Sequence, residues 1–332
     1  MGTESGKILR MNYKLKKISG DASFREFYRL KKNNKTSIIV SAKKEKYKNL
    51  IVYSIVNKIL NSNKITAPKL ISNHYKNNMI QISDLGEKSF YDFIISKKNK
   101  IKDYKSLIKL IFKIQKIKLK KIYKLGKFRV KFSKYTLKNL HKESDLFFDW
   151  YLKYSLKNKN LKKIKKLLKN ELNTIYKKIN LNNDTFVHRD FHVSNIMINK
   201  KKVGLIDSQD AIIGNPLYDV ASLIDDVRIK LPPDLQDKLF EFYCEGSKYK
   251  NEKIKKLKTD FDILSVQRNL KILGIFIRLW KRDKKSNYLK FLSYTWTLIE
   301  RRLKNPIFKN LNTLMQKNLP LKKLKRLKKY EN

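Results

Sequence analysis

One short segment constrains the fold and the chemistry of this chain more than any other. It begins with the apolar run Thr185–Val187, continues through the polar residues 188–195, and becomes apolar again at residues 196–198. Short apolar runs separated by polar residues predict two buried strands joined by a loop. A third apolar run, residues 203–206, follows a polar turn and ends at Asp207. The last two runs therefore predict a β-hairpin that brings the ends of its strands together.

The loop and the hairpin carry the residue types that phosphoryl transfer requires. Asn195 follows Asp190 by five positions, and Asp207 ends the next strand. A carboxylate must receive the proton of the attacking hydroxyl, while a carboxamide oxygen and a second carboxylate hold Mg²⁺ against the nucleotide phosphates. We therefore assign Asp190 as the catalytic base, and Asn195 and Asp207 as metal ligands. Ordinary polar turn residues are the alternative, but the compound pattern is too specific for that reading.

The rest of the chain predicts an α+β protein with two lobes. Residues 27–30 and 37–40 are candidate strands, and residues 46–60 form a candidate helix with one apolar side. Helical spacing of apolar residues recurs over residues 107–114 and 161–179. The first lobe is therefore expected to be small and rich in strands, and the second to be larger and mainly helical.

A hinge between the lobes is predicted after the apolar strand at residues 79–82. The residues that follow include Asp84 and Leu85 and then a glycine, which permits a sharp change of direction. We place an N-terminal nucleotide-binding lobe at residues 1–83 and the hinge and C-terminal catalytic lobe at residues 84–332. Asp84 and Leu85 would receive the adenine of ATP.

A segment of small residues near the N-terminus is a candidate phosphate-binding loop. Backbone amides could approach phosphate oxygens there, although the segment alone would be an ordinary turn. The downstream catalytic motif favours nucleotide binding by Gly20, Asp21, Ala22, Ser23, Phe24 and Arg25. The strand lysine that kinases use to pair with phosphates is missing, because Ser41 stands where we expect it. Lys43, Lys44 or Arg25 would have to substitute.

These motifs together resemble the aminoglycoside phosphotransferase superfamily, and within it the bacterial N-acetylmuramate/N-acetylglucosamine anomeric kinases. The likeness rests on the catalytic loop and on residues 20–25, 147–152, 206–211 and 267–276, and it spans roughly residues 15–301. It implies a bilobal protein-kinase-like fold with ATP and Mg²⁺ as cofactors. It also implies phosphorylation of the anomeric hydroxyl of an amino sugar during peptidoglycan recycling.

The resemblance singles out further residues around the catalytic loop. Asp219 matches a buried aspartate that would support the loop, although capping a helix is an alternative. His192 would contact substrate or pack against the loop, and Arg268 and Lys271 would neutralise substrate charge or lie at the surface. Other candidates for contacting or supporting the substrate site are His188, Arg189, Gln209 and Asp210. Ser208 replaces the phenylalanine that usually follows the metal-binding aspartate, which removes a packing anchor.

The charge balance suggests an alternative function that is not enzymatic. The chain has 79 Lys and Arg against 29 Asp and Glu, a formal net charge of +50, which would suit a non-catalytic protein that binds nucleic acid or an acidic membrane. The cations are mostly lysines spread along the chain with abundant Asn and Ile, as AT-rich genomes produce, and no nucleic-acid-binding module accompanies them. We therefore expect no specific nucleic-acid partner.

A second enzymatic alternative keeps the fold but takes choline, an amino-alcohol or an aminoglycoside as acceptor, because a fold does not determine a substrate.

Cys244 is the single cysteine and cannot form an internal disulfide. No apolar stretch is long enough to cross a membrane, and residues 1–17 lack the apolar core of a signal peptide. We expect a monomeric cytoplasmic enzyme whose partners are ATP and a small sugar.

Overall fold

The computed structural model divides into two compact units. It describes residues 13–18, 25–33, 35–42, 48–156, 160–199 and 202–324. The first unit contains the described residues up to Glu87 together with residues 123–130 and 197–209, and the second contains residues 88–122, 131–196 and those from Asp210 onward. This division differs from the predicted boundary between residues 83 and 84, because two hairpins from later in the chain pack with the first unit.

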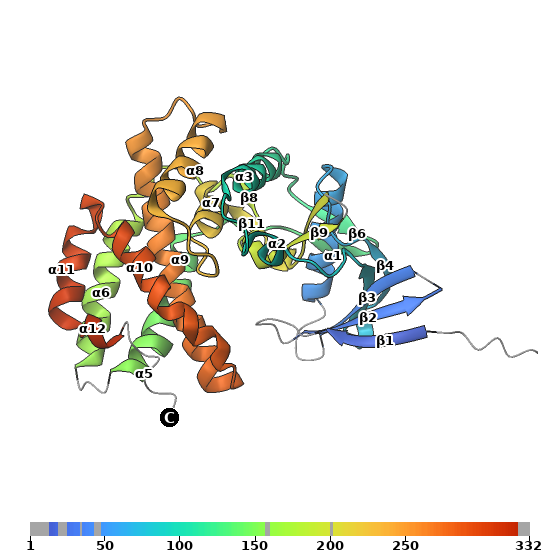
Figure 1. Ribbon diagram of the computed structural model, residues 1–332, viewed down its shortest axis with the longest axis horizontal. Helices are drawn as coiled ribbons and strands as arrows, with labels where there is room; N and C mark the ends of the chain where they lie inside the picture. The colour runs from blue at the N-terminus through green and yellow to red at the C-terminus, as the bar shows by residue number, and fades with distance from the viewer. Residues whose placement is uncertain are drawn as a thin grey trace, which may run out of the picture. The chain divides into compact units, whose positions relative to one another are not determined.

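The first unit is built on an antiparallel sheet with the strand order β1-β2-β3-β5-β4. Its strands are β1 Tyr13–Ile18, β2 Glu26–Lys32, β3 Lys35–Ser41, β4 Leu70–His74 and β5 Met79–Ser83. In the centre of the sheet Val40 of β3 lies opposite Ile80 of β5, and both side chains are buried. The helix α1, Lys48–Ser62, buries the apolar side that its spacing predicts and packs against β4. The strands β1, β2 and β3 lie side by side in Figure 1.

Two hairpins complete the first unit. One is formed by β6, Tyr123–Leu125, and β7, Phe128–Val130, and it packs against α1. The other is formed by β9, Ile196–Asn199, and β10, Lys202–Leu205. This second hairpin confirms the one predicted from the sequence, and β10 ends one residue earlier than the apolar run does.

The second unit is mainly helical, as expected. Its α-helices are α2 Phe90–Ile94, α3 Ile101–Gln115, α4 Leu137–Leu146, α5 Lys153–Ser155, α6 Leu161–Tyr176, α7 Leu217–Ile224, α8 Pro233–Gly246, α9 Ile254–Asp283, α10 Leu292–Arg302, α11 Lys309–Asn318 and α12 Leu321–Leu324. A π-helical turn, Phe147–Leu152, joins α4 to α5. A short antiparallel pair is formed by β8, Thr185–Val187, and β11, Ile212–Gly214. None of the described helices is long and apolar enough to cross a membrane.

The long helix α9 organises the second unit. It packs against α4, α7, α10 and the π-helical turn, and α10 lies beside it in Figure 1. At Gly274 the backbone of α9 approaches that of Leu146 so closely that a Cβ atom on Gly274 would lie 2.2 Å from the Leu146 carbonyl carbon. Glycine is therefore required at this crossing, which fixes α9 against the end of α4.

Candidate active site

The catalytic loop leaves β8 and turns back on itself within a few residues. Val187, the last residue of β8, lies opposite Ile212 of β11. The N–H of His192 donates to the carbonyl of Asp190 at 3.0 Å, and the N–H of Asn195 donates to the carbonyl of His192 at 2.9 Å. These local bonds give the loop a defined shape.

Asp219 holds the start of this loop. It lies in the first turn of α7 with 2% of its surface exposed, and its two carboxylate oxygens accept the N–H groups of His188 and Arg189, each at 2.8 Å. Burial raises the pKa of Asp219 to about 6, although the hydrogen bonds act in the opposite direction. The helix-capping alternative is wrong, because Asn215 accepts the N–H of Leu217 at the start of α7. Asp219 therefore supports the loop.

Arg189 anchors the loop from its other side. Its backbone has a φ of 76°, which is uncommon for a residue with a side chain, and its Nε donates to Oε1 of Glu143 at 2.9 Å. The other oxygen of Glu143 accepts the Tyr218 hydroxyl at 2.9 Å and Gln267 Nε2 at 3.0 Å. Lys271 Nζ lies 3.5 Å from the same oxygen. A buried network thus joins the loop to α4, α7 and α9.

Glu143 is the centre of that network and was missed by the sequence analysis. Burial raises its pKa, but the positive charges of Lys271 and Arg189 lower it further, to about 2. Glu143 lies within a charged stretch of the sequence, so its residue type did not indicate a buried role. The available signal was its position between Leu140 and Phe147, which places Glu143 on the buried side of the helix.

Two predicted cations on α9 are not at the surface. Arg268 is 4% exposed, and the side chain of Lys271 is 13% exposed. The surface alternative is therefore wrong for both. Asp210 is exposed, and its carboxylate lies 3.8 Å from Nη1 of Arg189.

Asn195 and His192 lie within the loop itself. Nδ2 of Asn195 donates to the carbonyl of Asp190 at 3.1 Å, so its carboxamide oxygen is the atom available for a metal. His192 is buried. Burial and the positive charges of Arg228 and Arg268 lower the pKa of His192 well below its ordinary value. The imidazole is therefore neutral near pH 7.

The first unit carries the other proposed metal ligand. Asp207 follows β10 with a φ of 60°, and its Oδ1 accepts Nε2 of Gln209 at 2.8 Å. Ser208 is fully buried, and its hydroxyl donates to Oδ1 of Asn57 on α1 at 2.6 Å. In place of the packing anchor that a phenylalanine would supply, Ser208 ties the strand end to α1 by a hydrogen bond.

Arg25 is the one candidate substitute for the missing strand lysine that lies within the described residues. It is 5% exposed, and its guanidinium carbon lies 5.8 Å from the ring centre of Tyr53. Burial raises the pKa of Tyr53 to about 12, and the charges of both Asp207 and Arg25 act on the same phenol. Arg25 and Asp207 therefore lie around one buried side chain. Ser41, where a lysine was sought, is buried.

The predicted hinge residues are fixed to the first unit. Arg29 of β2 donates from Nε to Asp84 Oδ2 at 2.6 Å and from Nη2 to the Gly86 carbonyl at 2.9 Å. The side chain of Asp84 is thus engaged, which leaves the backbone of this segment and Leu85 to meet a ligand. Arg29 was not predicted, because a single basic residue on a strand has no distinguishing pattern.

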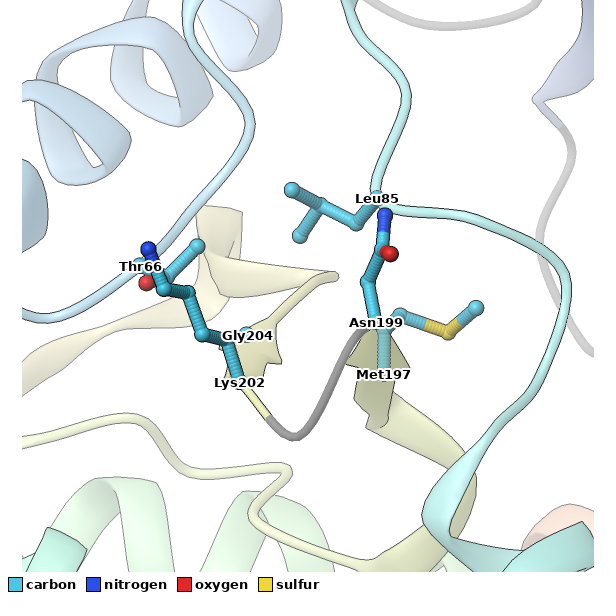
Figure 2. A pocket seen from close by; sticks show the side chains of 6 residues that line it. All are labelled: Thr66, Leu85, Met197, Asn199, Lys202 and Gly204. Carbon is cyan, nitrogen blue, oxygen red and sulfur yellow. The ribbon is translucent and has the colours of Figure 1, made fainter.

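A cavity of about 250 Å³ lies beside Leu85. Figure 2 shows Thr66 and Leu85 next to the β9–β10 hairpin, which contributes Met197, Asn199, Lys202 and Gly204. A Cβ atom on Gly204 would lie 2.8 Å from Leu85 Cδ1 and 3.3 Å from Thr66 Cγ2. The absence of a side chain at Gly204 therefore helps to keep the cavity open.

Part of the predicted nucleotide site cannot be placed. Gly20, Asp21, Ala22, Ser23 and Phe24 lie outside the described residues, as do Lys43 and Lys44. The described candidates fall into two groups. Arg25, Asp84, Leu85, Asp207 and Gln209 belong to the first unit, and the second unit contains His188, Arg189, Asp190, His192, Asn195, Asp210, Asp219, Arg268 and Lys271.

Comparisons with known proteins show the family and the fold of the chain. A model of the phosphotransferase enzyme family matches residues 14–253. The N-acetylmuramate/N-acetylglucosamine kinase of Pseudomonas aeruginosa is 25% identical over 296 residues, which cover 86% of this chain and 83% of the relative. The kinase of the same name from Neisseria meningitidis is 25% identical over 284 residues and covers 83% of each. A crystal structure of spectinomycin phosphotransferase APH(9)-Ia with ADP and spectinomycin has a TM-score of 0.58 and 13% identity, covering 88% of this chain and 93% of that one. This similarity confirms the expected kinase-like α+β fold.

Proposed function

The chain belongs to the phosphotransferase enzyme family, and we propose that it transfers the γ-phosphoryl group of ATP to the anomeric hydroxyl of N-acetylmuramate and N-acetylglucosamine. The observation that carries the proposal is the catalytic loop, in which Asp219 fixes the backbone before Asp190 while Asn195 bonds to the Asp190 carbonyl. The two kinase relatives that match more than four fifths of the chain support the choice of acceptor.

Asp190 acts as the base. It accepts the proton of the anomeric hydroxyl as that oxygen bonds to the γ-phosphorus and the bond between this phosphorus and the β–γ bridging oxygen breaks, which leaves ADP. Most of the rate enhancement in such reactions comes from positioning. The buried Glu143 network serves this purpose by preventing Arg189, the neighbour of Asp190, from moving.

Asn195 and Asp207 would hold Mg²⁺. Their donor atoms are a carboxamide oxygen and a carboxylate oxygen, which suit this hard cation. When bound, Mg²⁺ neutralises the charge that develops on the phosphate oxygens. Nδ2 of Asn195 donates to the Asp190 carbonyl, and Oδ1 of Asp207 accepts Nε2 of Gln209. Each bond fits this role because it orients the side chain.

The nucleotide would bind in the first unit. The cavity beside Leu85, lined by Thr66 and Met197, would receive the adenine. Arg25 would supply the positive charge that the missing strand lysine usually provides. The proximity of Arg25 and Asp207 to Tyr53 supports this assignment.

The test is turnover with Mg·ATP and each amino sugar, followed by ³¹P NMR to identify the phosphorylated position. The wild-type enzyme should form the anomeric phosphate and ADP in equal amounts. Asp190→Asn should reduce kcat by at least about 10³-fold, in the range expected for loss of a general base, with an unchanged circular dichroism spectrum. Substantial activity in this variant, or turnover of choline and aminoglycosides alone, would contradict the proposal.

A further inference from the structure

A buried arginine in the second unit lacks the partners that such a residue needs. Arg268 lies in the middle of α9 with 4% of its surface exposed. Its Nη1 atom makes no hydrogen bond to any described residue. A guanidinium withdrawn from water costs several kcal/mol unless an acceptor compensates it. The other deeply buried arginine of this unit, Arg302, has such a partner, since it forms two hydrogen bonds to Asp225 at 2.7 and 2.8 Å.

Two carboxylates that follow α7, Asp225 and Asp226, are already engaged. Asp225 also accepts the hydroxyl of Ser265, one turn before Arg268. Asp226 accepts Arg228 Nη1 at 3.2 Å and the N–H of Val193 at 3.0 Å. The charge of Arg268 is therefore not balanced by the described acidic side chains next to it.

Two further cations beside the same catalytic loop have acidic partners, since Lys271 pairs with Glu143 and Arg228 with Asp226. Lys271 follows Arg268 by three positions and so shares its side of α9. His192, two residues after Asp190, is buried beside the loop. Its Nδ1 is another buried atom without a partner among the described residues. Arg268 thus differs from these cations because its buried Nη1 has no acceptor among the described residues, and an anionic group on the bound substrate would supply one.

We propose that Arg268 binds the carboxylate of N-acetylmuramate and thereby sets the preference of the enzyme between its two acceptors. A guanidinium matches a carboxylate with two parallel hydrogen bonds, which would supply the missing acceptors. N-acetylmuramate carries a lactyl carboxylate, whereas N-acetylglucosamine has a hydroxyl at the same position and is neutral. The inference rests on the proposed function and adds the residue that distinguishes the acid from the neutral sugar.

The experiment compares kcat/KM for the two sugars in wild type, Arg268→Gln and Arg268→Lys. Loss of a charged hydrogen-bonded pair should lower kcat/KM for N-acetylmuramate about 100-fold in Arg268→Gln, mainly through KM. In Arg268→Gln the kcat/KM for N-acetylglucosamine should stay within about twofold of the wild-type value. In Arg268→Lys the kcat/KM for N-acetylmuramate should be at least about tenfold higher than in Arg268→Gln, because lysine restores the charge. Lys281→Gln, which removes an exposed cation from the same helix, should leave kcat/KM unchanged for both sugars.

The possible results separate this inference from the proposed function. An equal loss on both sugars, or unchanged turnover of the acid, overturns the role of Arg268 while the kinase assignment stands. A wild-type enzyme that phosphorylates neither sugar overturns both. Should Arg268→Gln fail to fold, the wild type can be compared on N-acetylmuramate and its neutral carboxamide. A KM for the carboxamide about 100-fold higher supports the inference, and equal KM values overturn it.

Discussion

The carboxylate of Asp219 holds the backbone of Arg189 in the left-handed region, with Oδ1 accepting the Arg189 N–H at 2.8 Å and the residue at a φ of 76°. This conformation costs about 1–3 kcal/mol for a residue other than glycine. A buried carboxylate with two oxygens can bind both N–H groups at the bend, which no neutral side chain of the same shape can do.

Replacing this carboxylate should therefore affect both stability and catalysis. In Asp219→Asn one of the two N–H groups would face an amide donor, so we expect a loss of about 2–4 kcal/mol in the free energy of unfolding. The kcat should fall at least about tenfold, because the loop before Asp190 loses its support. Urea denaturation and steady-state kinetics measure the two effects. Asp234→Asn, an exposed aspartate in the first turn of α8, is the matched control and should change stability by less than about 0.5 kcal/mol.

Glu143 should make the stability of the protein sensitive to acid. Its pKa is lowered from 4.5 to about 2 in the folded state, so the unfolded chain binds the proton more readily. Its stabilising contribution is present above pH 4.5 and is lost as the pH falls toward 2. We expect the difference in unfolding free energy between wild type and Glu143→Gln to shrink by about 2 kcal/mol from pH 6 to pH 3. A difference that does not vary with pH would contradict this account of the network.

Gly204 should control access of the nucleotide. In Gly204→Val the new side chain would meet Leu85 and Thr66 and fill part of the cavity between them. We expect KM for ATP to rise about tenfold, equivalent to about 1.4 kcal/mol. The KM for the sugar serves as the internal control and should change less than about twofold. Isothermal titration with a non-hydrolysable ATP analogue would check the effect independently of turnover.

Two adjacent arginines on α10 should differ sharply in their contribution to stability. Arg302 is 2% exposed and pairs with Asp225, whereas Arg301 pairs with the half-exposed Asp237. Removal of one member of a buried pair leaves the other charge without compensation, so Arg302→Ala should cost about 3–5 kcal/mol. Arg301→Ala should cost less than about 1 kcal/mol. Thermal or urea denaturation measures both losses. Similar losses of stability in the two variants would show that burial does not determine how much each arginine contributes to stability.

The sequence assigns roles only to residues whose chemistry demands particular side chains at fixed spacing. Asp190, Asn195 and Asp207 stand out because phosphoryl transfer restricts which side chains can serve, and the short apolar runs place them on a loop and a hairpin. Local periodicity likewise predicted α1 and the β9–β10 hairpin to within a few residues.

Arg29 and Glu143 could not be predicted because their roles depend on contacts between distant segments. Arg29 meets Asp84 across 55 positions, and Glu143 meets Arg189 across 46. No local pattern encodes such a pairing. The same reason explains why the two units differ from the predicted boundary, since residues 197–209 belong to the first unit through packing.

The cavity beside Leu85 has a consequence for how the protein is made. One side of it comes from residues before Glu87 and the other from the hairpin that begins near Met197. At about 5–20 residues per second, a ribosome needs roughly 5–20 s to synthesise the stretch between them. During that interval one side of the cavity is missing. The proposed nucleotide site in the first unit is therefore completed only after most of the chain has been translated.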